Sequence, residues 1–376
     1  MRLMGVLMSF RRIALAGAML PLILVSQVGV SLAADQDPPP VKANAKPVAD
    51  VPFFFVNDNR FSYAFEPKGT DPGAFSLRPN GTFDGTTAKQ VVNFTHFDVW
   101  AYGTNFITMS VLKSDSNDPV APCSNAGVLL SGTTANCAGA VEFYGLLRST
   151  FGWNELFNTR AFAMGPLSNI SFEVGADDET ENSLFAPQKH DLVAGLQFAF
   201  ELPYKGYFNV APLFYKEWNH NAFNQCGLFG PGTPGVTCTS TGNVDYKGTW
   251  AVETNWFMDL GFLPENMRYF SISGRAGWYG PKGDQNAPLV GTGVGINSTA
   301  TKTEFNSEPI RLTFDASKAI WGPKYSHYLD FWVAYRYWQN KFGLDHNAAP
   351  GVCTVAGVST NSCTEQTVYT GVTVKF

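Results

Sequence analysis

The feature that most constrains this chain is the alternation of apolar and polar residues in segments of about ten residues or more. In the segment 191–202, the even positions from Leu192 to Leu202 are apolar, whereas the odd positions include Asp191, Gln197 and Glu201. Such a period of two predicts a β-strand with one apolar and one polar face. The same pattern recurs in the segments 249–260, 269–280, 309–316 and 328–338.

Counting the alternating segments predicts twelve strands, at about 52–66, 90–101, 103–113, 140–152, 168–178, 189–202, 206–219, 247–260, 267–280, 304–316, 326–341 and 364–376. An even number of strands of this length is typical of an antiparallel β-barrel that spans an outer membrane. Such a barrel must close, because lipid offers no partner to unpaired backbone groups. A secreted β-sandwich is the alternative interpretation of the same pattern.

The connections between the expected strands favour the barrel. If both ends of the barrel domain lie in the periplasm, short turns such as 203–206 and 261–267 lie on the periplasmic side. The long connections then fall on the outer side, at about 67–89, 114–139, 179–188, 220–246, 281–303 and 342–363. Short turns on one side and long loops on the other are the usual barrel arrangement.

The N-terminal residues predict export. Arg2, Arg11 and Arg12 precede an apolar run that ends in small residues, which indicates a cleaved signal peptide over residues 1–33. Residues 34–51 are rich in Pro and Ala and are expected to form a flexible periplasmic segment, followed by the barrel domain at 52–376. The exported chain would carry 26 − 3 = 23 basic and 31 acidic residues, a formal charge of −8. This charge disfavours a nucleic-acid polymer as a partner.

Six cysteines fall into three local pairs, and each pair brackets a loop rich in Gly, Ser, Thr or Pro. In an exported protein this arrangement predicts disulfides, and short closures have the lowest entropic cost. Zinc is the rival interpretation, but no Cys-x-x-Cys or clustered His accompanies a pair. The predicted disulfides are Cys123 with Cys137, Cys226 with Cys238, and Cys353 with Cys363.

The chain ends on Phe376, after alternating apolar residues that include Val368, Val372 and Val374. Chain ends are usually polar and frayed, so this pattern predicts a last strand that is paired to its final residue. A C-terminal aromatic residue in this setting resembles the signal read by the barrel-insertion machinery, which is therefore an expected partner during assembly.

The polar faces of the predicted strands would line the lumen. The expected inward carboxylates and bases are Asp98, Glu142, Glu173, Glu201, Glu217, Glu253, Asp259, Arg148, Arg275, Arg311 and Arg336. The expected inward aromatic residues are Trp100, Tyr102, Tyr144, Tyr215, Tyr279, Trp332 and Trp338. Buried charges must be paired or hydrated in any barrel, so a plugged structural barrel is one interpretation of this set. A narrow pore that stacks a planar solute on aromatic faces is the other.

Several segments resemble strands of the nucleoside-specific channel-forming family, the Tsx-type outer-membrane porins. They are 207–221, 248–264, 327–343 and 141–157, and the similarity extends from about Phe94 to Phe376 as strand order and aromatic–polar texture. The resemblance implies a monomeric twelve-stranded barrel whose narrow lumen takes nucleosides. It carries over Tyr215, Glu217, Arg336 and Trp338 as pore-lining candidates, whereas the three cysteine pairs and the long outer loops depart from the family pattern.

The sequence therefore predicts a passive, substrate-selective channel that sits in outer-membrane lipid and lipopolysaccharide as a monomer. We expect no catalytic residues, no cofactor and no metal site, since none of the five His lies near a GxSxG or HExxH motif. The alternatives are an adhesive or structural barrel with disulfide-stapled binding loops, and an outer-membrane hydrolase. The candidate pore-lining residues are Tyr215, Glu217, Glu253, Arg275, Arg311, Trp332, Arg336 and Trp338.

Overall fold

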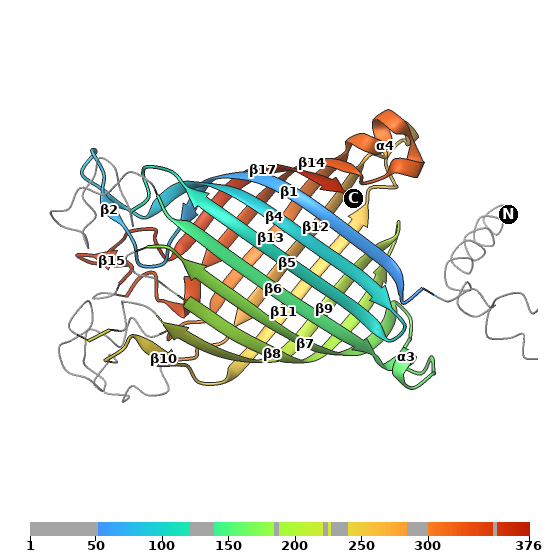
Figure 1. Cartoon of the computed structure of the whole chain (residues 1–376), viewed down its shortest axis with the longest axis horizontal. Coiled ribbons are helices and arrows are strands. Elements are labelled where there is room, and N and C mark those ends of the chain that lie inside the picture. Colours follow the sequence, from blue (N-terminus) through green and yellow to red (C-terminus); the bar gives the residue numbers. More distant parts are fainter. Residues whose placement is uncertain are drawn as a thin grey trace, which may run out of the picture. The chain divides into compact units, whose positions relative to one another are not determined.

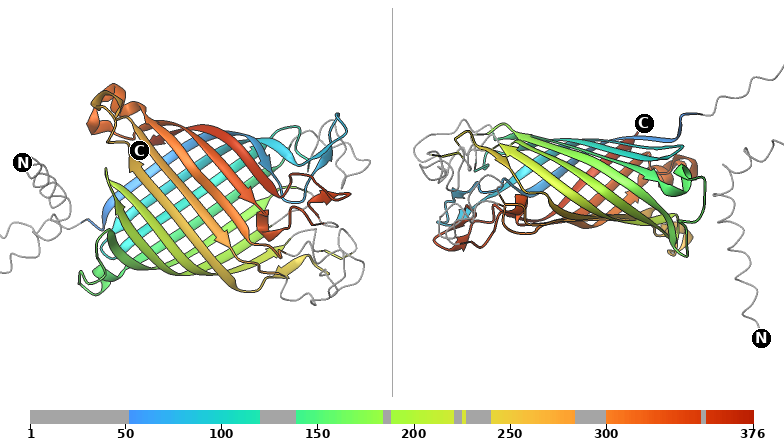
Figure 2. Two further views of the ribbon diagram at one scale, coloured as in Figure 1. Left: turned by 180° about the vertical axis from the view of Figure 1, so that it is seen from behind. Right: turned by 90° about the horizontal axis from the view of Figure 1, so that it is seen from below.

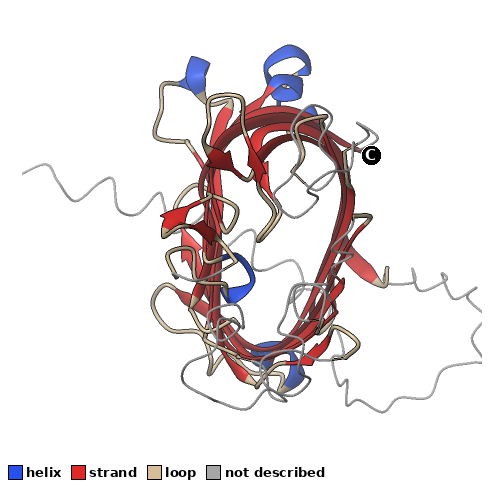
Figure 3. Cartoon of the chain, turned by 90° about the vertical axis from the view of Figure 1, so that its left-hand side faces the viewer, coloured by secondary structure: helices blue, strands red, loops and turns tan. Residues whose placement is uncertain are grey.

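The computed structural model describes residues 52–119, 139–183, 188–220, 225–226, 240–283, 300–348 and 352–376. The predicted signal peptide and the segment 34–51 lie outside this part of the chain. Twelve long strands form one antiparallel sheet that closes on itself (Figure 1). Neighbouring strands follow the sequence, β8 pairs with β9, and β17 pairs with β1. Seen along its axis, the barrel is flattened (Figure 3).

The strands of the barrel are β1 (Phe54–Thr70), β4 (Thr86–Trp100), β5 (Gly103–Ser114), β6 (Val141–Gly152), β7 (Leu167–Glu181), β8 (Gln188–Leu202), β9 (Gly206–His220), β11 (Thr249–Asp259), β12 (Phe270–Tyr279), β13 (Glu304–Asp315), β14 (Leu329–Gln339) and β17 (Thr364–Lys375). The connections hold the short strands β2 (Ser76–Leu77), β3 (Phe83–Asp84), β10 (Asn243–Asp245), β15 (Thr354–Val355) and β16 (Val358–Ser359). They also hold the short helices α3 (Trp153–Leu156), α4 (Ala316–Trp321), η3 (Glu265–Met267), η5 (Pro323–Tyr325) and η6 (Lys341–Gly343).

The two ends of the barrel differ in their connections (Figure 2). At one end, here called the turn end, β1 begins, β17 ends, and residues 101–102 and 203–205 join neighbouring strands. The opposite end, here called the loop end, holds the longer connections that contain β2, β3, β10, β15 and β16. The predicted alternation is incomplete, because the turn-end connections 153–166 and 316–328 are longer than the loop-end connection 182–187.

The outward face of the barrel is apolar. The large side chains that the barrel leaves exposed on this face include Phe61, Met109, Leu192 and Phe331. Aromatic residues gather near both ends: Trp100 contacts Phe151 at the turn end, and outward residues Trp278, Phe305 and Tyr337 form a contact series at the loop end. An apolar band between two aromatic girdles is the surface that a bilayer requires.

The first and last strands form the closing seam. Phe61 of β1 lies opposite Val374 of β17, and the backbone N–H of Phe376 donates to the carbonyl oxygen of Asn59 at 3.0 Å. The ring of Phe376 also contacts that of Phe94. The prediction that the final residue is paired is confirmed.

All twelve predicted strands are present, with ends displaced by up to four residues. Two differences reach four residues: β4 begins at Thr86 instead of 90, and β1 continues to Thr70 instead of ending at Glu66. Pro67 and Gly69 make the sequence resemble a break, but a bulge between Glu66 and Gly69 absorbs them and pairing with β4 resumes. Within the described part of the chain, no helix is long and apolar enough to cross a membrane.

One predicted disulfide is present in full. Cys353 and Cys363 are bonded, with 5.8 Å between their Cα atoms. Cys226 is also disulfide-bonded. Cys123, Cys137 and Cys238 lie outside the described residues, so the other two pairings stay predictions.

The expectation that Asp98 and Trp100 face the lumen is wrong. Both lie on the same side of β4 as Phe94, which pairs with outward-facing Phe61. Asp98 is compensated there by the amide of Asn105, at 2.9 Å, and by His96, at 3.1 Å. Alternation in this part of the sequence is masked because polar residues occur on both faces of β4.

Candidate functional site

The lumen of the barrel is lined mainly by polar and charged side chains. Inward positions on each strand alternate with the apolar outward ones, and many of the inward groups are buried. Burial of so many ionisable groups requires that they contact one another, because an isolated charge away from water is costly. The contacts divide the lumen into a mouth at the loop end, a middle and a turn end.

In the middle, Arg148 forms a strut across the lumen. Its guanidinium reaches from β6 to Glu253 on β11, with Nε–Oε2 and Nη2–Oε1 distances of 2.9 and 2.7 Å. Strands β7, β8 and β9 lie between β6 and β11 in the sheet, so this contact runs through the interior. The same guanidinium binds Asp177 of β7, at 2.5 Å from Nη1 to Oδ1. Tyr279 of β12 donates to Glu253 at 3.0 Å and completes the strut.

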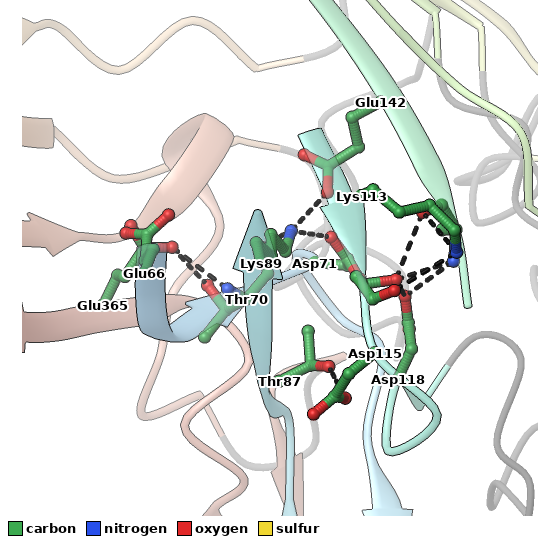
Figure 4. Close-up of polar contacts among 12 residues, drawn as sticks. Glu66, Thr70, Asp71, Thr87, Lys89, Lys113, Asp115, Asp118, Glu142 and Glu365 are labelled. Atoms are coloured by element: carbon green, nitrogen blue, oxygen red, sulfur yellow. Dashed lines mark hydrogen bonds and ion pairs between the residues drawn. The ribbon is translucent and has the colours of Figure 1, made fainter. Parts of the chain in front are cut away.

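One side of the mouth is built around Lys89 of β4 (Figure 4). Its ammonium group lies between Asp71, at 2.6 Å, and Glu142 of β6. It also donates to the carbonyl oxygen of Thr70 at 3.3 Å. The side chain of Lys89 is almost entirely buried, so the two carboxylates provide the compensation that water would otherwise provide.

The neighbouring contacts connect β14 and β17 to the same side of the mouth. Arg336 lies 3.5 Å from Glu66 and 3.3 Å from Glu365. Lys341, from η6, binds Glu365 at 3.0 Å and the carbonyl oxygen of Thr70 at 2.8 Å. The connection between β14 and β17 therefore enters the mouth.

The opposite side of the mouth is formed by β8 and β9. Glu217 accepts from Tyr215 and from Lys282, which follows β12. Tyr215 also donates to Asp191 at 3.2 Å. Lys189 lies 3.4 Å from Asp191 and 5.2 Å from the ring centroid of Phe342 in η6, on the far wall. The two sides of the mouth thus touch.

The turn end carries rings that are more accessible. Tyr207 of β9 is 44% exposed and stacks against Phe257 of β11, with ring centroids 6.2 Å apart. Phe257 in turn contacts His327 edge to face. Arg60 of β1 is close enough to Tyr207 for its charge to act on the phenol. Arg60, Tyr207, Phe257, Asp259 and His327 are here called the turn-end group.

His327, between η5 and β14, is held by carboxylates. Burial lowers its pKa, but hydrogen bonds to Asp259 and Asp330 and the charges of Asp330 and Asp315 outweigh burial and raise it to about 9. Candidate ligand atoms of Asp315, His327 and Asp330 lie within 4.8 Å of one another, a grouping that could hold a metal ion. A histidine ligand must be neutral, so the raised pKa favours an imidazolium–carboxylate cluster at neutral pH.

The structure places all eight predicted pore-lining residues on inward positions. Tyr215, Glu217, Arg336 and Trp338 lie at the mouth, Glu253 and Arg275 in the middle, and Arg311 and Trp332 on β13 and β14. Several of the rings are covered by the protein itself. Tyr215 is 1% exposed, and Arg311 lies 4.1 Å from the centroid of Trp332, which is 6% exposed. Binding of a solute by these eight residues stays a prediction.

The residues that the sequence reasoning missed include Tyr207 and Phe257 at the turn end, and Lys89, Lys341 and Phe342 at the mouth. Tyr207 and Phe257 continue the inward alternation of Tyr215 and Glu253, so extending each pattern to the turn end would have found them. Phe342 adopts a positive φ of 58° in a connection, and no periodic pattern extends there.

Neither a known protein-family model nor a curated protein matches this sequence. Solved structures that match include an outer-membrane channel from Pseudomonas putida F1, with 8% identity over 85% of this chain and 96% of that one, and a TM-score of 0.41. The translocator domain of the autotransporter NalP from Neisseria meningitidis matches with 8% identity over 85% and 89%, and a TM-score of 0.35. A KdgM porin in complex with oligogalacturonate matches with 8% identity over 85% and 99%, and a TM-score of 0.33.

The closed sheet, the apolar exterior with its two girdles and the charged interior define a bacterial outer-membrane β-barrel. This class follows from the geometry of the chain itself.

Proposed function

We propose that the protein is a passive channel that admits small polar solutes through the lumen, with its turn end in the periplasm. The observation that carries this proposal is the polar lining, which runs from the contacts of Lys89 at the mouth through Arg148 to the turn-end group. A lumen lined in this way is hydrated wherever it is open, and twelve strands suit a modest solute.

For the solute we propose nucleosides, on the resemblance of the strands described above. The exposed ring of Tyr207, which stacks on Phe257, supports this choice, because a planar base stacks on such a ring. Arg60 and Asp259 offer a donor and an acceptor beside these rings for the polar edges of the solute. Tyr215 and Trp332 contribute less to stacking, since their own neighbours cover them.

The test is the conductance of single channels of the refolded protein in a planar bilayer, before and after adenosine is added. We expect small current steps that adenosine blocks and that a sugar or an amino acid of similar size does not. Tyr207→Ala should weaken the block. Tyr63→Ala is the matched control, since Tyr63 has a similar exposure on the outward face of β1. A conductance that adenosine leaves unchanged would be consistent with a channel and would contradict the proposal that its solutes are nucleosides.

A second candidate function is an adhesive barrel. The observation that favours it is the contact of Lys189 with Phe342 across the mouth, which narrows the lumen at the loop end. A folded barrel that conducts no current would support this alternative. Its binding surface would then include the loop closed by Cys353 and Cys363.

A further inference from the structure

The mouth has a strong imbalance of charge. Fourteen inward ionisable side chains at the loop end are here called the mouth cluster: Lys89, Lys189, Lys282, Arg336 and Lys341, with Glu66, Asp71, Glu142, Glu179, Glu181, Asp191, Glu217, Glu304 and Glu365. Five bases and nine carboxylates give a formal charge of 5 − 9 = −4.

The bases of the mouth cluster are already engaged by the protein. Lys89 binds two carboxylates, Lys282 binds Glu217, and Lys341 binds Glu365. Their positive charge is therefore compensated within the barrel wall, and the excess carboxylates make the field at the mouth negative when they are ionised. Rings of one charge in a low-dielectric constriction concentrate the opposite ion.

Two buried carboxylates of the mouth cluster each offer an unpartnered oxygen. Asp191 of β8 is 1% exposed, and its Oδ1 has no hydrogen-bond partner among the described residues. Glu304 of β13 is 3% exposed, and the same holds for its Oε2 within that part of the chain. Their other oxygens accept from Tyr215, at 3.2 Å, and from Trp338, at 2.8 Å. Buried polar atoms normally find a partner, so two free oxygens of the same sign need an explanation.

The two carboxylates belong to one electrostatic unit although they lie on different walls. Strands β9, β11 and β12 separate β8 from β13 in the sheet. The charges of both Asp191 and Glu304 act on Lys189 and on Tyr215. Carboxylates on two walls of the mouth therefore act together on the charges that lie between them.

From this arrangement we propose that the mouth cluster is a cation filter, in which Asp191 and Glu304 are the residues that select cations and cationic solutes over anions. The inference rests on the proposed channel and adds the class of ion that it prefers. Neutral solutes pass without this preference, whereas an anion meets the excess of carboxylates.

The experiment measures the reversal potential of the refolded full barrel in a planar bilayer with a tenfold KCl gradient. For the unmodified protein, the reversal potential should have the sign expected when K⁺ permeates more readily than Cl⁻. Asp191→Asn and Glu304→Gln remove charge with little change in volume, and each should move the reversal potential toward zero, with a larger shift in the double variant. Asp178→Asn is the control, because Asp178 lies on the outward side of β7 with a 52% exposed side chain; it should leave the potential unchanged.

The outcomes separate the filter from the channel. A difference in electrophoretic migration between unboiled and boiled samples and a β-type circular dichroism spectrum verify that each variant has folded. An open channel that shows no preference between K⁺ and Cl⁻, or that prefers Cl⁻, overturns the proposed cation filter. The proposed channel function would still stand. An equal shift in Asp178→Asn overturns the assignment to Asp191 and Glu304. A folded barrel without any current overturns both proposals.

Discussion

Arg148 provides the most direct test of how the lumen is held. Replacement by Met keeps an unbranched chain about as long as the aliphatic stem of Arg148 and removes the guanidinium. Asp177 and Glu253 would then lose their contacts of 2.5 to 3.3 Å with Arg148. Two carboxylates on different walls would face one another across the lumen without a cation between them.

The expected loss of stability is large. Removal of one partner from a buried ion pair costs about 3–5 kcal/mol, because the remaining charge stays buried. Tyr279 still donates to Glu253, at 3.0 Å, which keeps the loss near the lower end of that range. The unfolding free energy should therefore fall by about 3 kcal/mol. The barrel should unfold at a correspondingly lower urea concentration.

Two measurements make the reasoning refutable. Urea unfolding in lipid vesicles, followed by tryptophan fluorescence, gives the change in stability, and single-channel recording gives the conductance. Arg148→Met should lower the stability of the barrel. It should raise the conductance, because the Arg148 side chain crosses the lumen. Adding Glu253→Gln should recover part of the stability by removing one unpaired charge. A change below about 1 kcal/mol with an unchanged conductance would show that Arg148 is not a strut.

Three further predictions concern other parts of the barrel. His327→Gln should destabilise the barrel at neutral pH: a pKa raised to about 9 contributes stability that is full below the ordinary value of 6.5 and is lost as pH rises through 9. Urea midpoints of the two proteins should thus converge above pH 9, and a constant difference would contradict the ion cluster. Gly371→Ala should displace Trp332, whose ring atoms would lie 2.3 Å from the new methyl group; unchanged near-ultraviolet circular dichroism would argue against this. The double variant Cys353→Ser, Cys363→Ser should increase current noise at the mouth, because the backbone N–H of Lys341 donates to the carbonyl oxygen of Cys363 at 3.0 Å. A quiet trace equal to that of the unmodified protein would separate the disulfide from the mouth.

The barrel was predictable from the sequence because lipid and lumen impose a period of two on each strand. The segment 188–202 shows why: Leu192 faces outward and Asp191 inward, so their chemistry reveals their faces. The same rule fails at Asp98, where His96 and Asn105 stabilise a carboxylate on the outward side. A local network of this kind has no periodic signature.

The contents of the lumen were harder to predict than its wall. Alternation placed Tyr215 and Trp332 inward correctly, but it contains no information on what covers them. Lys282 lies 5.4 Å from the ring centroid of Tyr215, although the two residues are far apart in sequence. The entry of Lys341 and Phe342 into the mouth likewise depends on left-handed backbone at Asn340 and Phe342, which a strand pattern does not describe.

The seam between β1 and β17 has a consequence for the order in which the barrel assembles. Ser62 and Thr373 are hydrogen-bonded across it at 2.8 Å and are 311 positions apart in the chain. Closing a flexible chain of that length costs about 5 kcal/mol of entropy, on the logarithmic dependence of loop closure. Every other pair among the twelve long strands joins strands that follow one another in the sequence, so the sheet can grow hairpin by hairpin. During this growth β1 is paired with β4 on one edge, and its other edge stays unpaired. Until β17 arrives, that edge must be shielded from both lipid and other chains, which makes seam formation the step at which assembly depends most on a catalyst.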